Sequence, residues 1–207
     1  MPQPWECQPG LLFVQAHARE WGVDPERMAV MGRSAGGQLA LLLAYPALHD
    51  PEGHGSRPTP FRAVIVLYGP VDLAAGYADP PRPDPINTRA VLEAFLGGSP
   101  ATRLELYRQA SPIHQVRPHL PPTLLIYGGR DHVVQPKYGQ LLATQLCQAG
   151  NAVAWIRIPW ADHAFDAVFR GLSSQLALYA SEHFLAATLK AGQDPFHRTP
   201  THDLNSG

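Results

Sequence analysis

Apolar and polar positions follow two kinds of pattern along the chain. A continuous apolar run rich in β-branched residues occupies 63–69, similar, mostly apolar runs occupy 123–129 and 152–159, and a shorter apolar run occupies 28–32. Such runs are typical of strands in a parallel sheet that is buried on both faces. Segments with helical periodicity or strong helix formers alternate with them, at 11–21, 35–45, 87–97, 137–150 and 165–189. We therefore predict an α/β fold, a mostly parallel sheet with helices on both faces.

Prolines mark the borders of these elements. The chain has 22 of them, clustered in stretches such as HDPEGHGSRPTP, ADPPRPDP and RPHLPP. Proline fixes φ and removes a backbone donor, so such stretches are expected to separate helices and strands. We expect one domain over residues 1–190, with a proline-rich, cap-like insertion at about 73–112. The residues from 191 to 207 have no periodicity and are expected to form a disordered tail.

Composition narrows the possible partners. Of 207 residues, 45% are hydrophobic and 16% charged, with a net charge of −1, so a basic surface for nucleic acid is not expected. No apolar stretch approaches the roughly 18 residues of a membrane span, and the first ten residues lack signal-peptide features. A cytoplasmic location is the expectation. Cys7 and Cys147 do not stand in a metal-ligand spacing.

Polar residues that can perform chemistry follow three of the predicted strands. They are Ser34 in GRSAGG, Asp131 in YGGRDH and His163 in PWADHAFD. The chain order Ser, Asp, His is that of hydrolases with a nucleophile elbow, in which the serine sits on a tight turn from strand to helix. Crowding in that turn demands small neighbours, which Gly32 and Gly36 supply. One G-x-S-x-G match arises by chance in roughly one chain in fifteen of this length at average composition; the three-strand context makes it more specific.

The roles of these residues follow from elementary chemistry. A serine hydroxyl needs a base during attack, and the neutral imidazole of His163 is suited to that task near pH 7. Asp131 would orient the imidazole and stabilise its charged form. The backbone N–H of Ala35, at the start of the following helix, would point at the developing oxyanion, aided by the helix dipole. This chemistry needs no cofactor.

Other acids and histidines are weaker candidates for the site. His132 and Asp162 each adjoin a proposed triad member, so neither can easily reach both other partners. Asp72 in YGPVDL is expected to cap a turn or helix, with a supporting site role as the alternative. The remaining histidines considered are expected in solvated loops or on helix surfaces: His17, His49, His54 and His183. No H-x-x-x-H or C-x-x-C spacing indicates a metal site.

GRSAGG, YGPVDL, YGGRDHVV and PWADHAFD together resemble the α/β-hydrolase superfamily, and most of all the carboxylesterases grouped with hormone-sensitive lipase and with bacterial feruloyl-esterase-like enzymes. The resemblance runs from about residue 10 to about residue 189. It implies an ester hydrolase that passes its acyl group through Ser34 and acts on a small-molecule ester. The same resemblance places substrate-shaping elements in the insertion, where an acyl pocket would be lined by Leu92, Phe95, Leu96 and Tyr107. Simple packing of these four residues onto the body is the alternative.

One family feature has no counterpart in the sequence. Related enzymes carry an H-G-G-G type loop, on strands ahead of the elbow, that supplies a second oxyanion amide. Its absence predicts a fold lacking its N-terminal strands and a loss of about 2.7–4 kcal/mol of transition-state stabilisation. The strand at 28–32 would then present an open edge for self-association or a partner strand. The alternative functions are a prolyl-oligopeptidase-like peptidase and an inactive, hydrolase-like binding scaffold.

Overall fold

The computed structural model describes residues 8–45 and 60–190, and its centre is a parallel sheet. The predicted loop at 47–61 therefore lies almost wholly outside the described residues, as does the predicted tail. The strands stand in the order β1-β2-β3-β4, and each neighbouring pair is parallel. Their bounds are β1 (Met28–Arg33), β2 (Phe61–Leu67), β3 (Thr123–Gly128) and β4 (Val153–Ile158). The predicted parallel sheet is confirmed.

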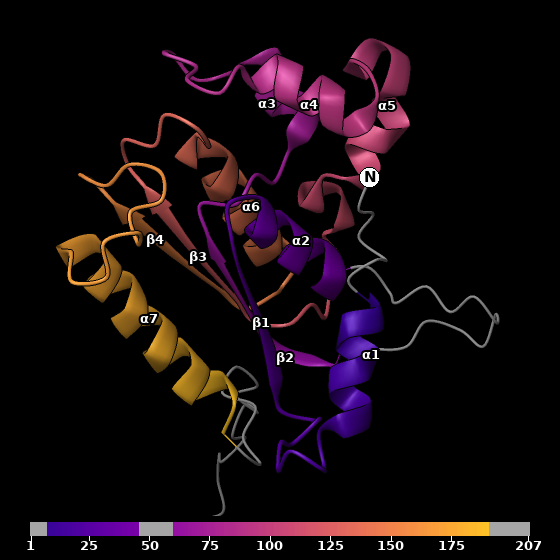
Figure 1. Cartoon of the computed structure of the whole chain (residues 1–207), viewed down its shortest axis with the longest axis vertical. Helices are drawn as coiled ribbons and strands as arrows, with labels where there is room; N and C mark the ends of the chain where they lie inside the picture. The colour runs from indigo at the N-terminus through magenta and orange to yellow at the C-terminus, as the bar shows by residue number, and fades with distance from the viewer. Residues whose placement is uncertain (1–7, 46–59, 191–207) are drawn as a thin grey trace, which may run out of the picture.

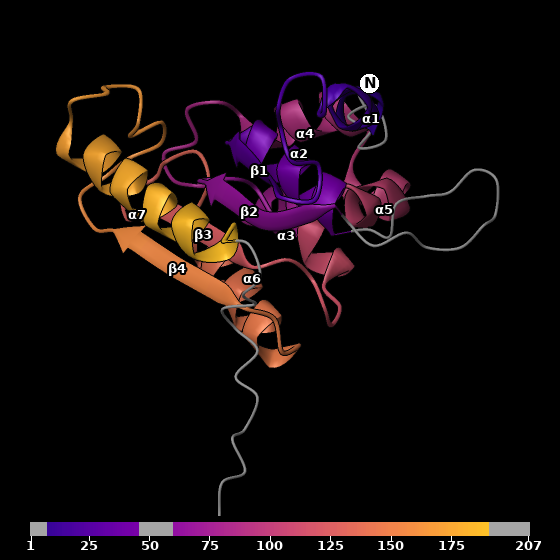
Figure 2. The same ribbon diagram turned by 90° about the horizontal axis from the view of Figure 1, so that it is seen from below.

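Helices cover the sheet from two sides (Figures 1 and 2). α2 (Ala35–Ala44) packs on β1 and β2, and α6 (Pro136–Gln148) packs on β3 and β4. α7 (Leu172–Thr188) lies against β2 and β3 on the other face. α1 (Gln8–His17) precedes β1 and buries Leu11 in the main core. This layered arrangement is the one that alternating strands and helices predict.

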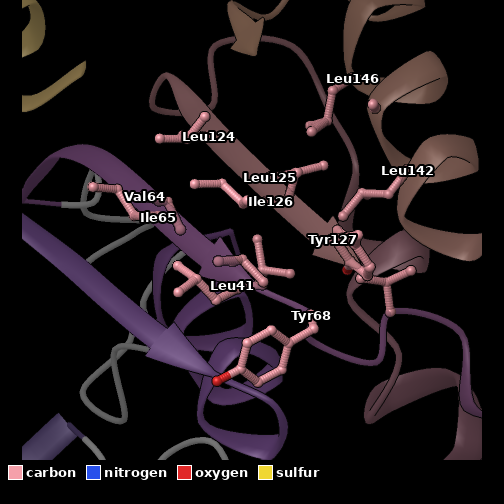
Figure 3. Packing of buried hydrophobic residues seen from close by; sticks show 14 of the residues in the cluster. Leu41, Val64, Ile65, Tyr68, Leu124, Leu125, Ile126, Tyr127, Leu142 and Leu146 are labelled. Atoms are coloured by element: carbon pink, nitrogen blue, oxygen red, sulfur yellow. The ribbon is translucent and has the colours of Figure 1, made fainter. Parts of the chain in front are cut away.

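Burial follows the position of each strand in the sheet. β2 and β3, in the middle, are buried almost throughout, whereas β1 and β4 are only half-buried. Figure 3 shows aliphatic side chains from the sheet meeting those from the helices. Leu41 of α2, Ile65 of β2, and Leu142 of α6 are each fully buried there. The continuous apolar runs therefore reflect burial on both faces.

A group of short helices stands beyond the sheet, at the top of Figure 1. We call residues 73–115 the cap segment. It contains α3 (Leu73–Ala78), α4 (Thr88–Leu96), α5 (Pro100–Gln109) and the 3₁₀ turn η2 (Pro112–Gln115). Of these, only α4 was predicted. Leu73, Leu96, Tyr107 and Ala110 form a second, smaller core within the cap segment.

Three buried hydrogen bonds fasten the end of the cap segment. Gln38 of α2 donates through Nε2 to the carbonyl oxygen of Ala110 at 2.6 Å. Ser111 accepts from the backbone N–H of Leu73 at 2.9 Å and donates to the carbonyl oxygen of Tyr107. Buried polar groups of this kind fix geometry, because breaking one leaves an unpaired partner. The cap segment is therefore held in a fixed position relative to α2, the helix that begins beside Ser34.

Within residues 8–45 and 60–190, no helix has the length and apolar character needed to span a membrane.

Candidate active site

Ser34 occupies the turn between β1 and α2 in a strained backbone conformation. Its φ is 49° and its ψ is −126°, in a region that residues with side chains rarely adopt. Such a conformation costs about 1–3 kcal/mol and persists only where surrounding contacts impose it. The N–H of Ser34 donates to the carbonyl oxygen of Leu67 at 2.9 Å, and its own carbonyl accepts from the N–H of Gly37 at 2.9 Å. The turn is held from both sides.

The glycines around Ser34 differ in what they do. A Cβ at Gly32 would lie 2.0 Å from the carbonyl oxygen of Gly36, so no side chain fits there. A Cβ at Gly36 would meet nothing within 4 Å, and the prediction that Gly36 must be small is wrong. Gly36 matters through its backbone, which fills the space beside Gly32. Gly37 is also required, although the serine motif does not include it, because a Cβ there would lie 2.8 Å from Cγ1 of Val66.

The two glycines give a matched pair of substitutions. Gly32→Ala is expected to lower the free energy of unfolding by about 3 kcal/mol or more, because the new methyl group overlaps backbone that cannot rotate away. Gly36→Ala adds the same methyl group inside α2, where replacing glycine is worth about 0.5–1 kcal/mol of added stability. Urea unfolding followed by circular dichroism measures both. Equal changes in the two variants would contradict this account of the turn.

Three side chains from separate strand ends meet at this turn. Oγ of Ser34 lies 2.9 Å from Nε2 of His163, and Nδ1 of His163 lies 2.9 Å from Oδ2 of Asp131. The Asp131 side chain is fully buried. Its other oxygen, Oδ1, accepts hydrogen bonds from the backbone N–H groups of Val133 and Val134, both at 2.8 Å. The carboxylate is fixed, and the hydroxyl, imidazole and carboxylate form a continuous chain of hydrogen bonds.

The two weaker candidates pair with each other. Nδ1 of His132 lies 2.8 Å from Oδ2 of Asp162, and Oδ1 of Asp162 accepts from the backbone N–H of His132 and of His163. Burial raises the pKa of Asp162, but these hydrogen bonds outweigh it and hold the pKa below its ordinary value. The loop after β3 contributes Asp131 and His132, and the loop after β4 contributes Asp162 and His163. In each acid–histidine pair, the acid comes from one loop and the histidine from the other. Only the Asp131–His163 pair reaches Ser34.

A mostly apolar cavity of about 320 Å³ opens beside Ser34. Ser34 and Ala35 line it, together with residues of the cap segment and of the chain around 133–138. Its apolar wall includes Val71, Ile86, Val91, Leu92, Phe95 and Val134. As the first residue of α2, Ala35 has a backbone N–H without a partner inside the helix. The cavity therefore combines an apolar wall with a hydroxyl and a helix N-terminus at one end.

The predicted pocket residues divide into two groups. Leu92 and Phe95 line the cavity. Leu96 and Tyr107 do not, and their predicted place in the pocket is corrected. Leu96, the last residue of α4, packs with Tyr107 in the core of the cap segment, and the Tyr107 hydroxyl donates to the carbonyl oxygen of Gly98 at 3.2 Å. Some apolar residues of α4 therefore line the cavity, and another packs against the neighbouring helices of the cap segment.

Asp72 has the capping role expected of it and also borders the cavity. It is the N-cap of α3, and its Oδ1 accepts from the backbone N–H of Ala75 at 2.9 Å. Side-chain oxygens at this position satisfy one of the unpaired donors of the first helical turn. Asp72 also lines the cavity, where most of the other lining residues are apolar.

The chain matches known sequences over most of its length. A family model described as BD-FAE matches residues 3–146. Two proteins of Mycobacterium tuberculosis are similar: one named "Probable carboxylic ester hydrolase LipM", 31% identical over 89% of this chain, and "Esterase LipC", 29% identical over 78%. The matched regions span 43% and 40% of those relatives, so the chain covers less than half of their length.

Solved structures of an esterase from Thermogutta terrifontis share the fold. Its butyrate-bound form superposes with a TM-score of 0.67 at 28% identity, covering 92% of this chain and 67% of that one. The form phosphonylated by sarin gives a TM-score of 0.70 at 26% identity, covering 88% and 64%.

Proposed function

The chain belongs to the BD-FAE family and has an α/β-hydrolase fold, and from that premise we propose that it hydrolyses carboxylic esters through an acyl group carried on Ser34. The observation that supports this most directly is the chain of hydrogen bonds from Ser34 through His163 to Asp131, with both distances at 2.9 Å. These are distances at which a proton passes between heavy atoms. The homologous esterases support the same class of reaction.

In the proposed acylation step, Oγ of Ser34 attacks the ester carbonyl carbon while Nε2 of His163 accepts the hydroxyl proton. The carbonyl oxygen becomes an anion near the N–H of Ala35, at the positive end of α2. The imidazolium is stabilised by the Asp131 carboxylate. When the tetrahedral intermediate collapses, the C–O bond to the alcohol breaks and the alcohol takes the proton from His163. An acyl ester on Ser34 remains.

Deacylation repeats the sequence with water as the nucleophile. His163 accepts a proton from water as its oxygen attacks the acyl carbon, and then returns that proton to Oγ of Ser34 as the carboxylic acid leaves. Asp131 stays ionised throughout. Protons balance within each half-reaction, so the chemistry needs only the ester and water.

The cavity suggests the size of the acyl group. Its volume of about 320 Å³ lies at the lower end of the range for small-molecule sites, and its wall is mostly apolar. We propose esters with short to medium aliphatic or aryl acyl chains. The similar Thermogutta terrifontis esterase was solved with butyrate bound, a ligand of that size.

Phe95 limits this cavity from the side of α4. Phe95→Ala is expected to shift the preferred p-nitrophenyl ester from short toward longer chains, with a change of about 10-fold or more in the ratio of kcat/KM for octanoate over butyrate. The matched control is Leu104→Ala on α5, an exposed residue that does not line the cavity. An unchanged ratio in Phe95→Ala would mean that the acyl chain binds elsewhere.

Two assays on the purified chain test the proposed function. In the first, a fluorophosphonate is added and the modified peptide is identified by mass spectrometry, with Ser34 expected as the labelled residue. In the second, turnover of p-nitrophenyl butyrate is compared with turnover of a proline-containing peptide amide. Ester turnover alone supports the esterase, faster amide turnover indicates the peptidase, and neither labelling nor turnover in a folded protein indicates a binding scaffold.

A further inference from the structure

Three residues outside the Ser34–His163–Asp131 chain of hydrogen bonds connect the turn that carries Ser34 with the loop after β4 that carries His163. We call these two segments the nucleophile turn and the histidine loop. Arg33 directly precedes Ser34, Tyr68 follows β2, and Asp166 comes three residues after His163. Nη1 of Arg33 donates to Oδ2 of Asp166 at 2.8 Å, and the Tyr68 hydroxyl donates to Oδ1 of the same carboxylate. The Asp166 side chain is only 14% exposed, so it receives both donors in a partly dehydrated place. A single carboxylate in the loop after β4 thus joins the ends of β1 and β2.

Tyr68 also packs directly against the imidazole. The rings of Tyr68 and His163 have centroids 4.6 Å apart at 62°, an edge contact, and Phe165 makes a similar contact with Tyr68 at 5.0 Å and 80°. Figure 3 shows Tyr68 at the border of the core, with its hydroxyl pointing away from Leu142 and Leu146. The residue as a whole is only 2% exposed. Its ring is fixed by packing, and its hydroxyl is fixed by Asp166.

Backbone strain gathers at the same place. Tyr68 has a φ of 44° and Ala164 a φ of 55°, close to the 49° of Ser34. Positive φ is uncommon for residues other than glycine, and a bulky tyrosine rarely adopts it. Strain of this kind persists where the surroundings impose it, and it concentrates at functional sites. Here it occurs in the nucleophile, in the histidine loop and in the tyrosine that touches the histidine.

The protonation states keep these contacts intact. Burial raises the pKa of Asp166, but the hydrogen bonds from Arg33 and Tyr68 outweigh it and hold the pKa below its ordinary value. Burial, and then the bond to Asp166, raise the pKa of the Tyr68 hydroxyl well above its ordinary value. Tyr68 therefore keeps its proton and Asp166 keeps its charge. A hydrogen bond from a neutral hydroxyl to a carboxylate is shorter and stronger than one between neutral groups.

We propose that Arg33, Tyr68 and Asp166 are positioning residues for His163. None of them touches Oγ of Ser34. The hydrogen bonds at Nδ1 and Nε2 leave the imidazole free to tilt about the line that joins the two nitrogen atoms. The Tyr68 ring limits that tilt, and Asp166 prevents the ring from moving away. The proposal rests on the proposed function, in which His163 must accept and return a proton without losing its alignment.

The test removes each contact with the smallest change that does so. Tyr68→Phe keeps the ring and deletes the hydroxyl, Asp166→Asn keeps the shape and deletes the charge, and Arg33→Lys keeps a cation. Tyr77→Phe is the matched control, because the Tyr77 hydroxyl donates to Glu93 in the cap segment and does not line the cavity. Thermal unfolding of every variant is measured alongside, which separates loss of fold from loss of alignment.

The first readout is independent of catalysis. In the unmodified chain, ¹⁵N and ¹³C NMR of the His163 imidazole is expected to show one sharp species with the proton on Nδ1. Tyr68→Phe and Asp166→Asn are expected to broaden those signals or mix the two tautomers, whereas Tyr77→Phe leaves them unchanged. Unchanged His163 signals in both Tyr68→Phe and Asp166→Asn would overturn the proposal. If Asp166→Asn does not fold, Tyr68→Phe, which loses a single oxygen atom, decides.

The second readout is the kinetics of p-nitrophenyl butyrate hydrolysis. Tyr68→Phe and Asp166→Asn are expected to lower kcat by about 10- to 100-fold, with KM within about twofold, since a misplaced base slows the chemical step. Their losses should not add in the double variant, because both act through one contact. Arg33→Lys is expected to lose less than Asp166→Asn. Perturbed His163 signals in a chain without turnover would sink the proposed function and leave the positioning role standing. Full kcat in both variants would overturn that role.

Discussion

Ser34→Ala is expected to reduce kcat for p-nitrophenyl butyrate by on the order of 10⁵- to 10⁶-fold, because the variant has no oxygen to carry the acyl group. The substitution removes one atom from a turn whose backbone is held by bonds to Leu67 and Gly37, so the fold should survive. KM is expected to change little. The measurement is steady-state kinetics on both proteins, at an enzyme concentration high enough to detect residual turnover.

The matched control for Ser34→Ala is Ser99→Ala. Ser99 is the N-cap of α5, but its hydroxyl makes no capping hydrogen bond. Turnover by Ser99→Ala should equal that of the unmodified chain. Retention of more than about 1% of the activity in Ser34→Ala would show that a different nucleophile, or water acting directly, cleaves the ester.

Asp131→Asn is expected to lower kcat by about 10⁴-fold while preserving the fold. The reason lies in the two backbone N–H groups of Val133 and Val134, which both donate to Oδ1. An asparagine must turn its oxygen toward these donors, which directs its NH₂ group at Nδ1 of His163. The imidazole then carries its proton on Nε2, where it cannot accept the proton of Ser34.

The crossed pairing of the two loops supplies the control for this prediction. Asp162→Asn changes the neighbouring acid in the same way, and the asparagine oxygen can still accept from the backbone N–H groups that Oδ1 now binds. Its loss of kcat is expected to stay below about 10-fold, in keeping with an exposed pair that is worth little. A larger loss in Asp162→Asn than in Asp131→Asn would reverse the assignment of the acid.

Much of the sheet and of the site could be predicted from residue patterns, for a physical reason. The runs at 63–69 and 123–129 are almost wholly apolar because β2 and β3 are buried on both faces. The carboxyl ends of parallel strands share one edge, so Ser34, Asp131 and His163 could be expected together from their positions after three strands. Local rules sufficed because each of these residues follows its own strand.

Most helices of the cap segment could not be predicted from residue patterns in this way. α3 has only six residues, and α5, which begins at Pro100, does not separate apolar and polar residues onto different faces. Proline suits the first turn of a helix as well as it suits a loop, so a proline-rich stretch does not distinguish the two. Leu96 and Tyr107 are the kinds of residue expected in a pocket wall. Whether such a residue lines the cavity or packs between helices depends on how the helices pack, which the sequence pattern does not show.

Contacts between distant segments were also invisible in the sequence. Arg33 and Asp166 are 133 positions apart, and the motifs that contain them, GRSAGG and PWADHAFD, do not indicate that the two side chains meet. Gly36 fits the familiar serine motif, yet the steric need lies at Gly32 and Gly37, which approach backbone and a strand side chain. A five-position pattern such as G-x-S-x-G records which small residues are present, whereas the close approach that requires them is a property of the folded chain.

The separate core of the cap segment has a consequence for how such a protein can diversify. Leu73, Leu96, Tyr107 and Ala110 are packed among themselves, apart from the main core between the sheet and its helices. Substitutions on the cavity side of α4 therefore meet few constraints from the strands that carry the reactive groups. If the chain hydrolyses esters as proposed, changes in the cap segment can alter the preferred ester while Ser34, Asp131 and His163 stay the same. In the proposed function, the cap-segment residues that line the cavity and the residues that carry out the reaction thus belong to separately packed parts of one chain.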